Sequence, residues 1–383
     1  MTLKTSNNAS RPRRIWIDGF EANVPQRLGS SQVAFELIKN IERIDRENDY
    51  TILLPSSPIK DLPKERFGFK YKIYKPNKFK TRIGIPLAIH LSKEKPDVFF
   101  SPTHYIPQFI STPRVVTIFD LAFFHFQNLF TKRDFLQLKN WTGYSIKNAK
   151  QIITISQSSK KDIIEFHKVD PGKITVAYPG YDDQIFRPIK NQNEINNVLQ
   201  KYEISGKFVV FLGTIQPRKN LKRLIEAFEK IDDVKLVVIG KTSGPGRQGW
   251  MYQEILDLPK KLEIEDKIQF CGFVPTEELP FIFSAAQAYI LPSLWEGFGI
   301  PVLEAMACGT PAIVSNISSL PEVVGDVGLL VDPNSTTQIE QAIRTITTDK
   351  KLRDKLSKKS LEQVKKFSWE KMAGEVIRVL EGV

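Results

Sequence analysis

The sequence predicts an α/β protein made of two doubly wound parallel-sheet domains. Its 383 residues exceed the ~100–200 residues of a typical single domain. Twelve short runs rich in β-branched and apolar residues alternate with segments of helical periodicity. These runs are too continuously apolar for strands with one face in water, which favours parallel sheets covered by helices on both faces.

The expected strands fall into two sets of six. The first set comprises residues 14–19, 50–55, 97–101, 114–118, 151–155 and 173–177. The second set comprises residues 207–213, 234–240, 267–272, 287–291, 311–315 and 328–331. The polar, turn-rich segment between them predicts an N-terminal domain over 1–190 and a C-terminal domain over 191–366.

Residues 367–383 form a separate closing segment that has the pattern of a helix. Ser368 is a suitable N-cap, and Met372, Val376 and Leu380 recur at helical spacing on one face. Ligands of open parallel sheets bind beyond the carboxyl ends of the strands. Two such domains facing each other would therefore offer a binding cleft between them.

The composition limits where the protein works. No apolar run approaches the ~18–20 residues of a membrane span, and the N-terminal residues lack the apolar stretch of a signal peptide. Cys271 and Cys308 stand among apolar neighbours without metal-binding or redox spacing, so we expect buried free thiols. These features predict a cytoplasmic protein.

The formal net charge of +12 suggests an anionic partner, and the excess is concentrated in residues 56–93. That stretch holds ten Lys or Arg and two acidic residues, interleaved with five aromatic residues. It could contact an anionic membrane at the inner face of the cell membrane, or be an ordinary solvated face. We expect no nucleic acid as partner, because no nucleic-acid-binding module accompanies the charge.

The stretch WEGFGIPVLEAMACGTP at 295–311 places Glu296 and Glu304 eight residues apart. Paired carboxylates cut sugar bonds when they are ~5–5.5 Å or ~6.5–9.5 Å apart. An entirely helical segment would separate the two backbones by about 12 Å. Gly297 and Gly299 make the first half a loop, so the spacing disfavours a hydrolytic pair without excluding it.

The same stretch has a clear use as a loop followed by a helix. Gly297 and Gly299 allow close approach of the backbone to a ligand. The amides of Phe298, Gly299 and Ile300 would open a helix whose positive end favours an anion.

The ends of that helix also follow from the sequence. Pro301 suits the first helical position and Gly309 suits the C-cap. Glu304 would then lie in the first turn, where a carboxylate can simply complement the helix dipole. Both this structural role and a ligand-binding role stay open.

A second candidate anion site lies in FLGTIQPRKNLKRLIEAF at 211–228. Asn220 is a suitable N-cap for the helix that follows, so Arg218 and Lys219 would stand at its positive end. Cations there are disfavoured by ~0.3–1 kcal/mol unless an anion joins them. A bound diphosphate would supply that charge, and two solvated basic residues in a turn are the alternative.

Two other ligands are disfavoured. The sequence has no Asp-x-Asp and no cluster among its four histidines, so we expect no metal site. GPGRQG at 244–249 matches the dinucleotide pattern G-x-G-x-x-G, but Pro245 removes an amide and no acidic residue ends a strand about 20 residues on. We interpret this match as a surface loop.

Taken together, LPSLWEGFGIPVLEAMACGTPAIVSNISSLPEVVGDVGLLVDP (291–333) and GTIQPRKN (213–220) resemble the retaining glycosyltransferases of family 4, in particular its mannosyltransferase-like branch. Looser likeness covers IDGFEANVPQRLGSSQVAFEL near the start, TIFDLAFF (117–124), ITISQSSKKDI (153–163) and KITVAYPGYDDQIFRP (173–188). The resemblance implies the GT-B fold of two Rossmann-like domains. The acceptor would be bound by residues 1–190 and the nucleotide-sugar donor mainly by residues 191–366, and the final helix (367–383) would cross back to the first domain.

The resemblance also implies roles for single residues. Glu304 matches the second glutamate of an E-x7-E motif, which accepts hydrogen bonds from ribose hydroxyls, and Glu296 matches the first, beside the donor hexose. The amides of residues 298–300 would bind sugar hydroxyls and phosphate. Arg218 and Lys219 match a basic pair on the diphosphate, and residues 29–31 match a glycine-bearing loop of the first domain that approaches it.

The implied donor-binding residues are Gly29, Ser30, Ser31, Gly213, Thr214, Arg218, Lys219, Val274, Glu296, Gly297, Phe298, Gly299, Ile300 and Glu304. The implied catalytic residues are Asp120, Arg218, Lys219 and Glu296.

The sequence departs from the family pattern at three places. The usual His-Asp pair is Phe119-Asp120, which leaves Asp120 alone to orient the acceptor or to steady positive charge. The glycine loop reads GSS in place of a glycine pair, and Thr214 stands where some relatives have an arginine.

The implied reaction is transfer of a hexose, mannose favoured, with retention by front-face displacement. The donor would be a nucleoside-diphosphate sugar, GDP-mannose in preference to a UDP-sugar, with no cofactor and no metal. The acceptor would be a glycan or a lipid-linked sugar in cell-surface polysaccharide synthesis. A nucleotide-sugar epimerase of the same fold and a non-catalytic nucleotide-binding regulator are the alternatives.

Overall fold

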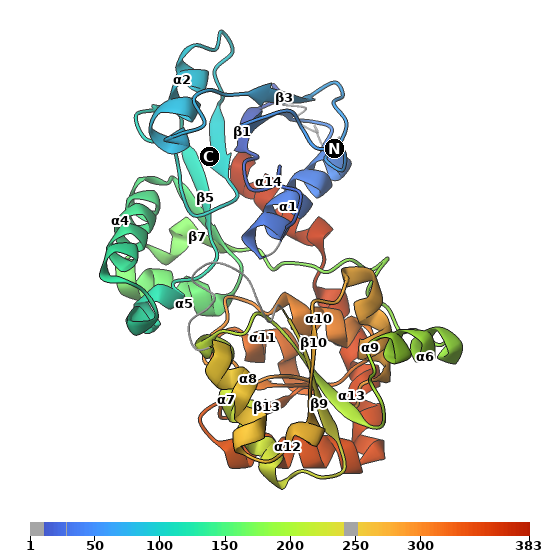
Figure 1. Ribbon diagram of the computed structural model, residues 1–383. Coiled ribbons are helices and arrows are strands. Elements are labelled where there is room, and N and C mark those ends of the chain that lie inside the picture. The colour runs from blue at the N-terminus through green and yellow to red at the C-terminus, as the bar shows by residue number, and fades with distance from the viewer. Residues whose placement is uncertain (1–10, 28, 241–251) are drawn as a thin grey trace, which may run out of the picture. The chain divides into compact units, whose positions relative to one another are not determined.

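The computed structural model describes residues 11–27, 29–240 and 252–383 (Figure 1). They divide into two compact units. The first unit holds residues up to Ile155, Lys160–Tyr178 and Trp369–Val383. The second holds Ser156–Ser159 and Pro179–Ser368. The chain therefore leaves the first unit, builds the second and returns.

The first unit is built on a seven-stranded sheet of order β3-β2-β1-β4-β5-β6-β7, in which all pairs are parallel. Its strands are β1 (Arg14–Asp18), β2 (Asp49–Leu54), β3 (Phe69–Ile73), β4 (Val98–Ser101), β5 (Arg114–Ile118), β6 (Gln151–Thr154) and β7 (Ile174–Val176). The strand order reverses between β1 and β4, which makes this pair the switch point where open sheets bind ligands.

The helices of the first unit pack around this sheet. They are α1 (Ser30–Ile44), α2 (Ile85–His90), α3 (Ala122–His125), α4 (Lys132–Asn148), α5 (Gln157–His167) and α14 (Trp369–Glu381). A π-helical turn at Lys80–Gly84 leads into α2. The strands are buried on both faces, as Ile15, Ile17, Val115, Val116 and Ile152 show by having no exposed surface.

The terminal helix α14 packs on α1 within the first unit (Figure 1). Met372, Val376 and Leu380, which the spacing places on one face, are all fully buried. Arg43 pairs with Glu370 at 2.6 Å, and Asn48 Nδ2 donates to Glu381 Oε1 at 3.0 Å. The amphipathic face buries apolar surface, and these polar contacts fix the register of the helix.

The second unit has a six-stranded sheet of order β10-β9-β8-β11-β12-β13, again with parallel pairs. Its strands are β8 (Phe208–Leu212), β9 (Lys235–Ile239), β10 (Ile268–Gly272), β11 (Tyr289–Leu291), β12 (Ala312–Ser315) and β13 (Leu329–Val331). Its helices are α6 (Gln192–Lys201), α7 (Leu221–Ala227), α8 (Tyr252–Lys261), α9 (Leu279–Ala285), α10 (Ile300–Ala307), α11 (Leu320–Val324), α12 (Thr336–Thr348) and α13 (Lys350–Gln363).

The predicted fold class of two parallel-sheet α/β domains is confirmed, and each of the twelve expected runs contains a strand. Strand β3 was not expected, because its sequence FKYKI alternates apolar and polar residues. This strand pairs only with β2 at the edge of the sheet, so one side of it faces water and its sequence lacks a continuous apolar run.

The two units divide at Tyr178 and Pro179, before the boundary at 190 expected from the sequence. Residues after 179 pack on the second unit. The ring of Phe186 lies against that of Phe283, and Ile189 N donates to Ser284 Oγ at 3.0 Å.

Cys271 and Cys308 are both free, with Cys308 buried and Cys271 partly buried. Burial raises the pKa of the Cys271 thiol to about 11. The sequence GPGRQG at 244–249 lies outside the described residues. In the described part of the chain, no helix combines the length and the apolar character needed to cross a bilayer.

Candidate functional site

Two loops meet at the carboxyl edge of the second sheet. One follows β8 and carries Arg218 and Lys219, and the other follows β11 and carries Glu296. Because β8 and β11 are neighbours in the sheet, their loops leave side by side. The backbone joins them directly, since Leu294 N donates to Arg218 O at 2.8 Å.

A buried ion pair ties the two loops together. The Glu296 side chain accepts from Lys219 Nζ at 2.7 Å and lies 3.4 Å from Arg218 Nη1. Ser293 Oγ donates to the same carboxylate at 2.6 Å. Burial acts to raise the pKa of Glu296, whose residue is only 6% exposed, but Lys219 and Arg218 outweigh it and hold the pKa below its ordinary value. Glu296 is therefore a carboxylate at neutral pH.

Asn220 fixes the turn that presents the basic pair. Its backbone is left-handed, with φ of 59°, which asparagine tolerates better than most residues. Its buried Nδ2 donates to Pro292 O at 2.9 Å and to Pro333 O at 2.6 Å, and Arg223 donates to its Oδ1 at 3.0 Å. Asn220 is the N-cap residue of α7, as expected, but its side chain makes no cap hydrogen bond and instead binds neighbouring loops.

The loop before α10 turns at Gly299, which has a φ of 104°. A side chain there would also collide with Leu320, 2.8 Å from an added Cβ. Ser319 Oγ donates to the carbonyls of Glu296 and Phe298 at 2.9 and 3.0 Å, and Glu296 N donates to Ser318 Oγ at 3.1 Å. The loop is thus held by hydrogen bonds in a fixed conformation.

Helix α10 differs from its predicted ends by one residue. It begins at Ile300, so Pro301 is its second residue, and Cys308 is the C-cap. Gly309 follows with φ of 80°, and its amide donates to Met306 O at 3.0 Å, as in a Schellman motif. Because the helix starts before Pro301, Glu304 is its fifth residue and lies beyond the first turn.

The protonation state of Glu304 bears on its role. The residue is partly buried, and burial together with the nearby Asp182 raises the pKa of Glu304 to about 8. The favourable effect of a helix dipole on a carboxylate falls off within the first turn. The position of Glu304 beyond that turn therefore argues against the structural role and leaves an acidic group able to bind a polar ligand.

The ends of β8, β9 and β10 bring further predicted residues to this edge. Gly213 N donates to Ile239 O at 3.0 Å, and an added Cβ on Gly213 would lie 3.7 Å from Lys219 Cε. An added Cβ on Gly240 would lie only 2.1 Å from Gly213 O. The two backbone segments can therefore approach this closely only if residue 240 is glycine. Thr214 is partly buried and Val274 is buried beyond the end of β10.

The predicted residues are distributed over both units. The second unit brings together Gly213, Thr214, Arg218, Lys219, Val274, Glu296, Gly297, Phe298, Gly299, Ile300 and Glu304 at one edge of its sheet. The first unit holds Gly29, Ser30, Ser31 and Asp120. Gly29 precedes α1 with φ of 56°, as a glycine-bearing turn requires, and Ser31 is buried in the helix.

Asp120 follows β5, and its Oδ1 accepts from Ala122 N at 3.0 Å. His104, from the loop after β4, stacks on the Phe119 ring at 5.5 Å, and its Nε2 accepts from Phe119 N at 3.1 Å. Burial lowers the pKa of His104, with Asp120 opposing that shift. A neutral imidazole therefore lies beside the position where the family pattern has a histidine.

Sequence reasoning missed several residues that build these sites. They are Asp182, Ser293, Ser318, Ser319 and His104. The serines lie just after β11 and β12, where polar residues at strand ends are a usable signal. His104 lies just after β4 and carried the same signal, whereas Asp182 follows no strand directly and carried none. Among the described residues, no group of three His, Cys, Asp or Glu could hold a metal ion.

The chain has the GT-B fold. It aligns with sucrose-phosphate synthase from Thermosynechococcus elongatus over 97% of this chain and 99% of that one, with TM-score 0.76 and 19% identity. It aligns with Anabaena Alr3699/HepE in complex with UDP and glucose over 97% and 100%, with TM-score 0.74 and 18% identity.

The chain belongs to the group 1 glycosyltransferases. Residues 192–363 match the family described as "Glycosyl transferases group 1", and residues 29–185 match "Glycosyltransferase Family 4". The O-antigen chain mannosyltransferase B of Escherichia coli is 33% identical over 73% of each chain. The prediction of a family 4 glycosyltransferase with mannosyltransferase relatives is thus confirmed.

Two further relatives match a shorter stretch. The D-inositol 3-phosphate glycosyltransferase of Corynebacterium glutamicum is 29% identical over 60% of this chain, and the serotype-specific mannosyltransferase WbdA of Escherichia coli is 28% identical over 58%. These stretches cover 57% and 28% of the relatives' own lengths.

The contacts of Asn220 make its replacement costly. We expect Asn220→Ala to lower the free energy of unfolding by roughly 2–4 kcal/mol, because two buried carbonyls lose their donor. Urea unfolding of the full chain measures this loss. Asn193→Ala, on the exposed face of α6, is the control and should stay within about 0.5 kcal/mol. Equal unfolding curves for the two variants would show that the Asn220 contacts add no stability.

Proposed function

We propose that this protein is a retaining hexosyltransferase that moves mannose from GDP-mannose to a glycan or lipid-linked acceptor in cell-surface polysaccharide synthesis. The observation that carries the proposal is the basic pair Arg218 and Lys219, fixed on buried Glu296 at the carboxyl edge of the second sheet. The mannosyltransferase relatives favour mannose as the sugar. The structural neighbour with bound UDP supports a UDP-sugar as the alternative donor.

The net positive charge of the Arg218, Lys219 and Glu296 side chains suits a bound diphosphate. Two cations face one carboxylate, so one positive charge is left over, and the side chains of Arg218 and Lys219 are still partly exposed. A diphosphate bound there would accept charge-assisted hydrogen bonds, which are stronger than neutral ones. We assign the amides of Phe298, Gly299 and Ile300, at the start of α10, to the donor sugar and phosphate.

The proposed reaction is a front-face displacement. The bond between the anomeric carbon and the diphosphate oxygen breaks, and a bond from the same face to the acceptor oxygen forms. The acceptor proton passes to a donor phosphate oxygen. Arg218 and Lys219 stabilise the charge that develops on the leaving diphosphate. Glu296 positions the hexose, and Asp120 orients the acceptor or stabilises the positive charge on the sugar.

The deciding experiment incubates the full chain with GDP-mannose or UDP-sugars and a panel of glycan acceptors, in chelator. Mass spectrometry detects transfer, and NMR of the product determines the anomeric configuration. An α-mannosyl product from GDP-mannose supports the proposal, and a β-linked product contradicts retention. Conversion of the donor without an acceptor indicates an epimerase, whereas nucleotide binding without any transfer indicates a regulator.

Lys219→Ala should lower kcat by about 10²–10³-fold, because one donor to the leaving group is lost. Steady-state kinetics with saturating donor measure the change, and circular dichroism checks the fold. Lys222→Ala is the matched control, since Lys222 lies one turn further on and pairs with exposed Glu254. An unchanged kcat in Lys219→Ala would show that Lys219 does not stabilise the leaving diphosphate.

Nucleotide binding should release a proton. Ribose hydroxyls that donate to Glu304 favour its charged form, so binding lowers its pKa from about 8. Raising the pH from about 6 to 8 should then increase the affinity for GDP by at most tenfold per pH unit. No further gain is expected above the pKa of Glu304 in the unbound protein. Calorimetry in buffers of different ionisation enthalpy measures the proton.

Two variants test the source of that proton. Some of the protons released on binding come from the phosphate groups of GDP. Glu304→Gln should abolish the remaining proton release. Glu277→Gln, at an exposed position of the second unit, should leave it unchanged. Identical proton release in wild type and Glu304→Gln would contradict the assignment of Glu304 to the ribose.

The basic stretch 56–93 divides into structural and exposed parts. Lys72 lies 4.6 Å from the Trp16 ring centroid, Arg66 pairs with Glu42 and Lys80 pairs with Asp18, so these cations serve the fold. Of its five aromatic residues, Phe69 and Tyr74 are buried in the core.

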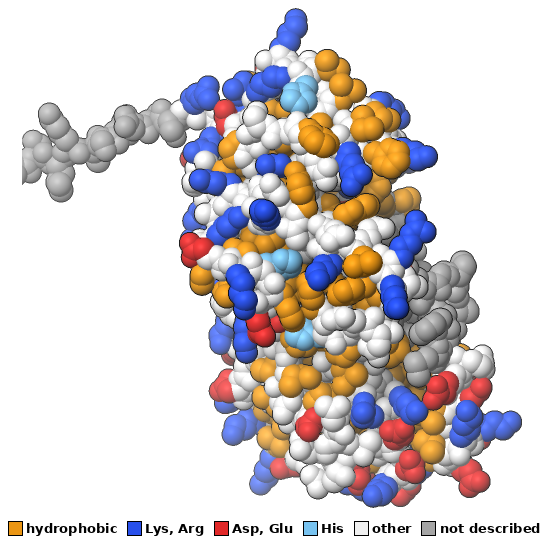
Figure 2. All heavy atoms as spheres, turned by 90° about the vertical axis from the view of Figure 1, so that its left-hand side faces the viewer, with side chains coloured by type: hydrophobic (Ala, Val, Ile, Leu, Met, Phe, Trp, Pro, Cys, Tyr) orange, Lys and Arg blue, Asp and Glu red, His pale blue; other side chains and the backbone are white. Residues whose placement is uncertain are grey.

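An exposed apolar group lies around α2. It comprises Ile83, Leu87, Leu91 and Phe109, with Leu91 and Phe109 about three-quarters exposed. Figure 2 shows hydrophobic side chains gathered among Lys and Arg on this face of the first unit. Apolar side chains beside cations suit an anionic bilayer, which would place the enzyme at the inner face of the cell membrane.

The double change Leu91→Ser and Phe109→Ser should weaken binding to vesicles of phosphatidylglycerol and phosphatidylcholine at least tenfold, because two exposed apolar side chains are lost. Co-sedimentation with the vesicles measures the binding of each protein. Leu330→Ser, an exposed position in the second unit, is the control. Equal binding by all three proteins would contradict this membrane surface, and absence of binding by the wild type would contradict membrane contact.

A further inference from the structure

Helix α5 begins in one unit and continues in the other. Its first turn lies within Ser156–Ser159, which pack with the second unit, whereas the helix from Lys160 onward belongs to the first. The contacts that hold this first turn therefore also fix the point from which the rest of the helix extends.

A glutamate from a distant part of the chain holds the first turn of α5. Glu322 Oε2 accepts from Gln157 N at 2.9 Å, and its Oε1 accepts from Ser158 N at 3.1 Å. The Ser156 hydroxyl accepts from Ser159 N at 3.0 Å, so a local residue already caps the helix. Glu322 follows Gln157 by 165 residues and ties helix α11 to the start of α5.

Helix α11 is also tied to the loop at 296–300, which we assign to the donor. Ser319 is the N-cap residue of α11, yet its hydroxyl binds this loop rather than α11 itself. It donates to the carbonyls of Glu296 and Phe298 at 2.9 and 3.0 Å. One short segment therefore contacts both the donor loop and the start of α5.

The residue before Ser319 is strained. Ser318 has φ of 57°, a left-handed conformation that costs energy for a serine and is typical of functional sites. In this conformation its Oγ accepts from Glu296 N at 3.1 Å. The apolar residues of α11, which are Leu320, Val323 and Val324, have no exposed surface, so the helix is firmly packed.

Further along, α5 contacts the segments on either side of Asp120. Asp162, which is 4% exposed, places its Oδ2 3.0 Å from Nε2 of His125 in α3. Ile163 belongs to a buried cluster that includes the two residues flanking the Phe119–Asp120 pair, Ile118 and Leu121. A shift of α5 would therefore change the position of the turn that carries Asp120.

We propose that Glu322 is a positioning residue for the transfer reaction, and that it acts on Asp120 through α5. A diphosphate that binds the amides of the donor loop restrains the loop, and Ser318 and Ser319 restrain α11 in turn. The hydrogen bonds from α5 to Glu322 then open less often, and the turn at Asp120 is better fixed. The inference rests on the proposed function and deepens it, because it joins donor binding to the residue assigned to the acceptor.

The first test needs no nucleotide. Hydrogen exchange of the full chain, followed by mass spectrometry, measures local opening of the backbone. Glu322→Ala should speed exchange of residues 157–159 about tenfold, because two amides lose a charged acceptor. It should also speed exchange of residues 119–124. Glu322→Gln keeps one acceptor oxygen in place, so its effect should be smaller, about threefold.

The second test adds GDP. Saturating GDP should slow exchange of residues 157–159 at least twofold in the wild type. In Glu322→Ala this effect of GDP should be lost, although the Kd for GDP should stay within about threefold of wild type, since both donor-loop serines remain. The kcat for transfer should fall about tenfold in Glu322→Ala and less in Glu322→Gln. A lower kcat with an unchanged Kd separates positioning from lost nucleotide binding.

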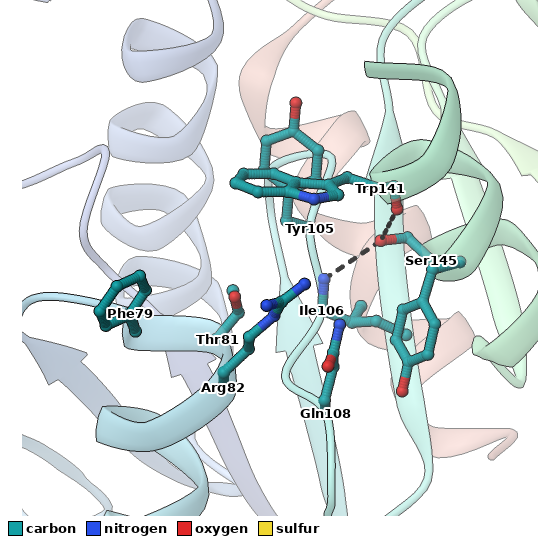
Figure 3. A pocket seen from close by; sticks show the side chains of 9 residues that line it. Phe79, Thr81, Arg82, Tyr105, Ile106, Gln108, Trp141 and Ser145 are labelled. Carbon is teal, nitrogen blue, oxygen red and sulfur yellow. Dashed lines mark hydrogen bonds between the residues drawn. The ribbon is translucent and has the colours of Figure 1, made fainter. Parts of the chain in front are cut away.

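Two control variants separate this role from a general effect of removing charge. Asp326→Ala removes an acidic side chain that follows α11 and is 85% exposed. Arg82→Gln removes an exposed cation of the first unit, beside a cavity of about 120 Å³ between the turn before α2 and helix α4 (Figure 3). Both variants should match the wild type in exchange of residues 157–159 and in kcat.

Three outcomes would overturn the proposal. They are unchanged exchange of residues 119–124 in Glu322→Ala, equal slowing by GDP in the wild type and Glu322→Ala, and no effect of GDP on residues 157–159 of the GDP-bound wild type. Failure of the wild type to bind GDP would contradict the proposed function instead. The nucleotide-free test would then still decide whether Glu322 acts on the turn at Asp120.

Discussion

The buried carboxylate of Glu296 is the constraint on which the second unit's site depends. An unpaired charge at that depth would cost several kcal/mol, so the fold must bring cations to it. Lys219 and Arg218 meet this need from a loop more than seventy residues earlier in the chain. They can do so because β8 and β11 are neighbours in the sheet. The pairing that removes the electrostatic penalty also holds two cations at the edge where a diphosphate would bind.

Residues that need touch no ligand hold this arrangement in place. The Asn220 side chain donates hydrogen bonds to carbonyls of two other loops. The Ser319 hydroxyl donates to the two carbonyls on either side of Gly297. With its backbone so fixed, the loop keeps its amides oriented before a ligand arrives. Stabilisation of developing charge is most effective when the donors need no reorganisation during the reaction.

Sequence reasoning found the strands whose runs are mainly apolar, including the edge strands β7, β10 and β13, because such a run is a local signal. It missed β3, whose sequence FKYKI alternates apolar and polar residues. The resemblance to a known family located Glu296 and Lys219, but neither spacing nor periodicity could show that they touch. The N-cap position of Asn220 was expected, but no local signal could show that its side chain donates to carbonyls far along the chain. His104 lies fifteen residues before Phe119, and only the folded sheet brings their rings together.

The lysines of β3 have a further consequence for the protein at high concentration. An edge strand exposes unpaired amides and carbonyls that can template pairing with another copy of the chain. Lys70 is exposed on this strand, and Lys72 beside it covers Trp16. Charges on an edge strand oppose such edge-to-edge growth. Part of the positive charge of residues 56–93 therefore protects the protein against self-association, independently of any partner it attracts.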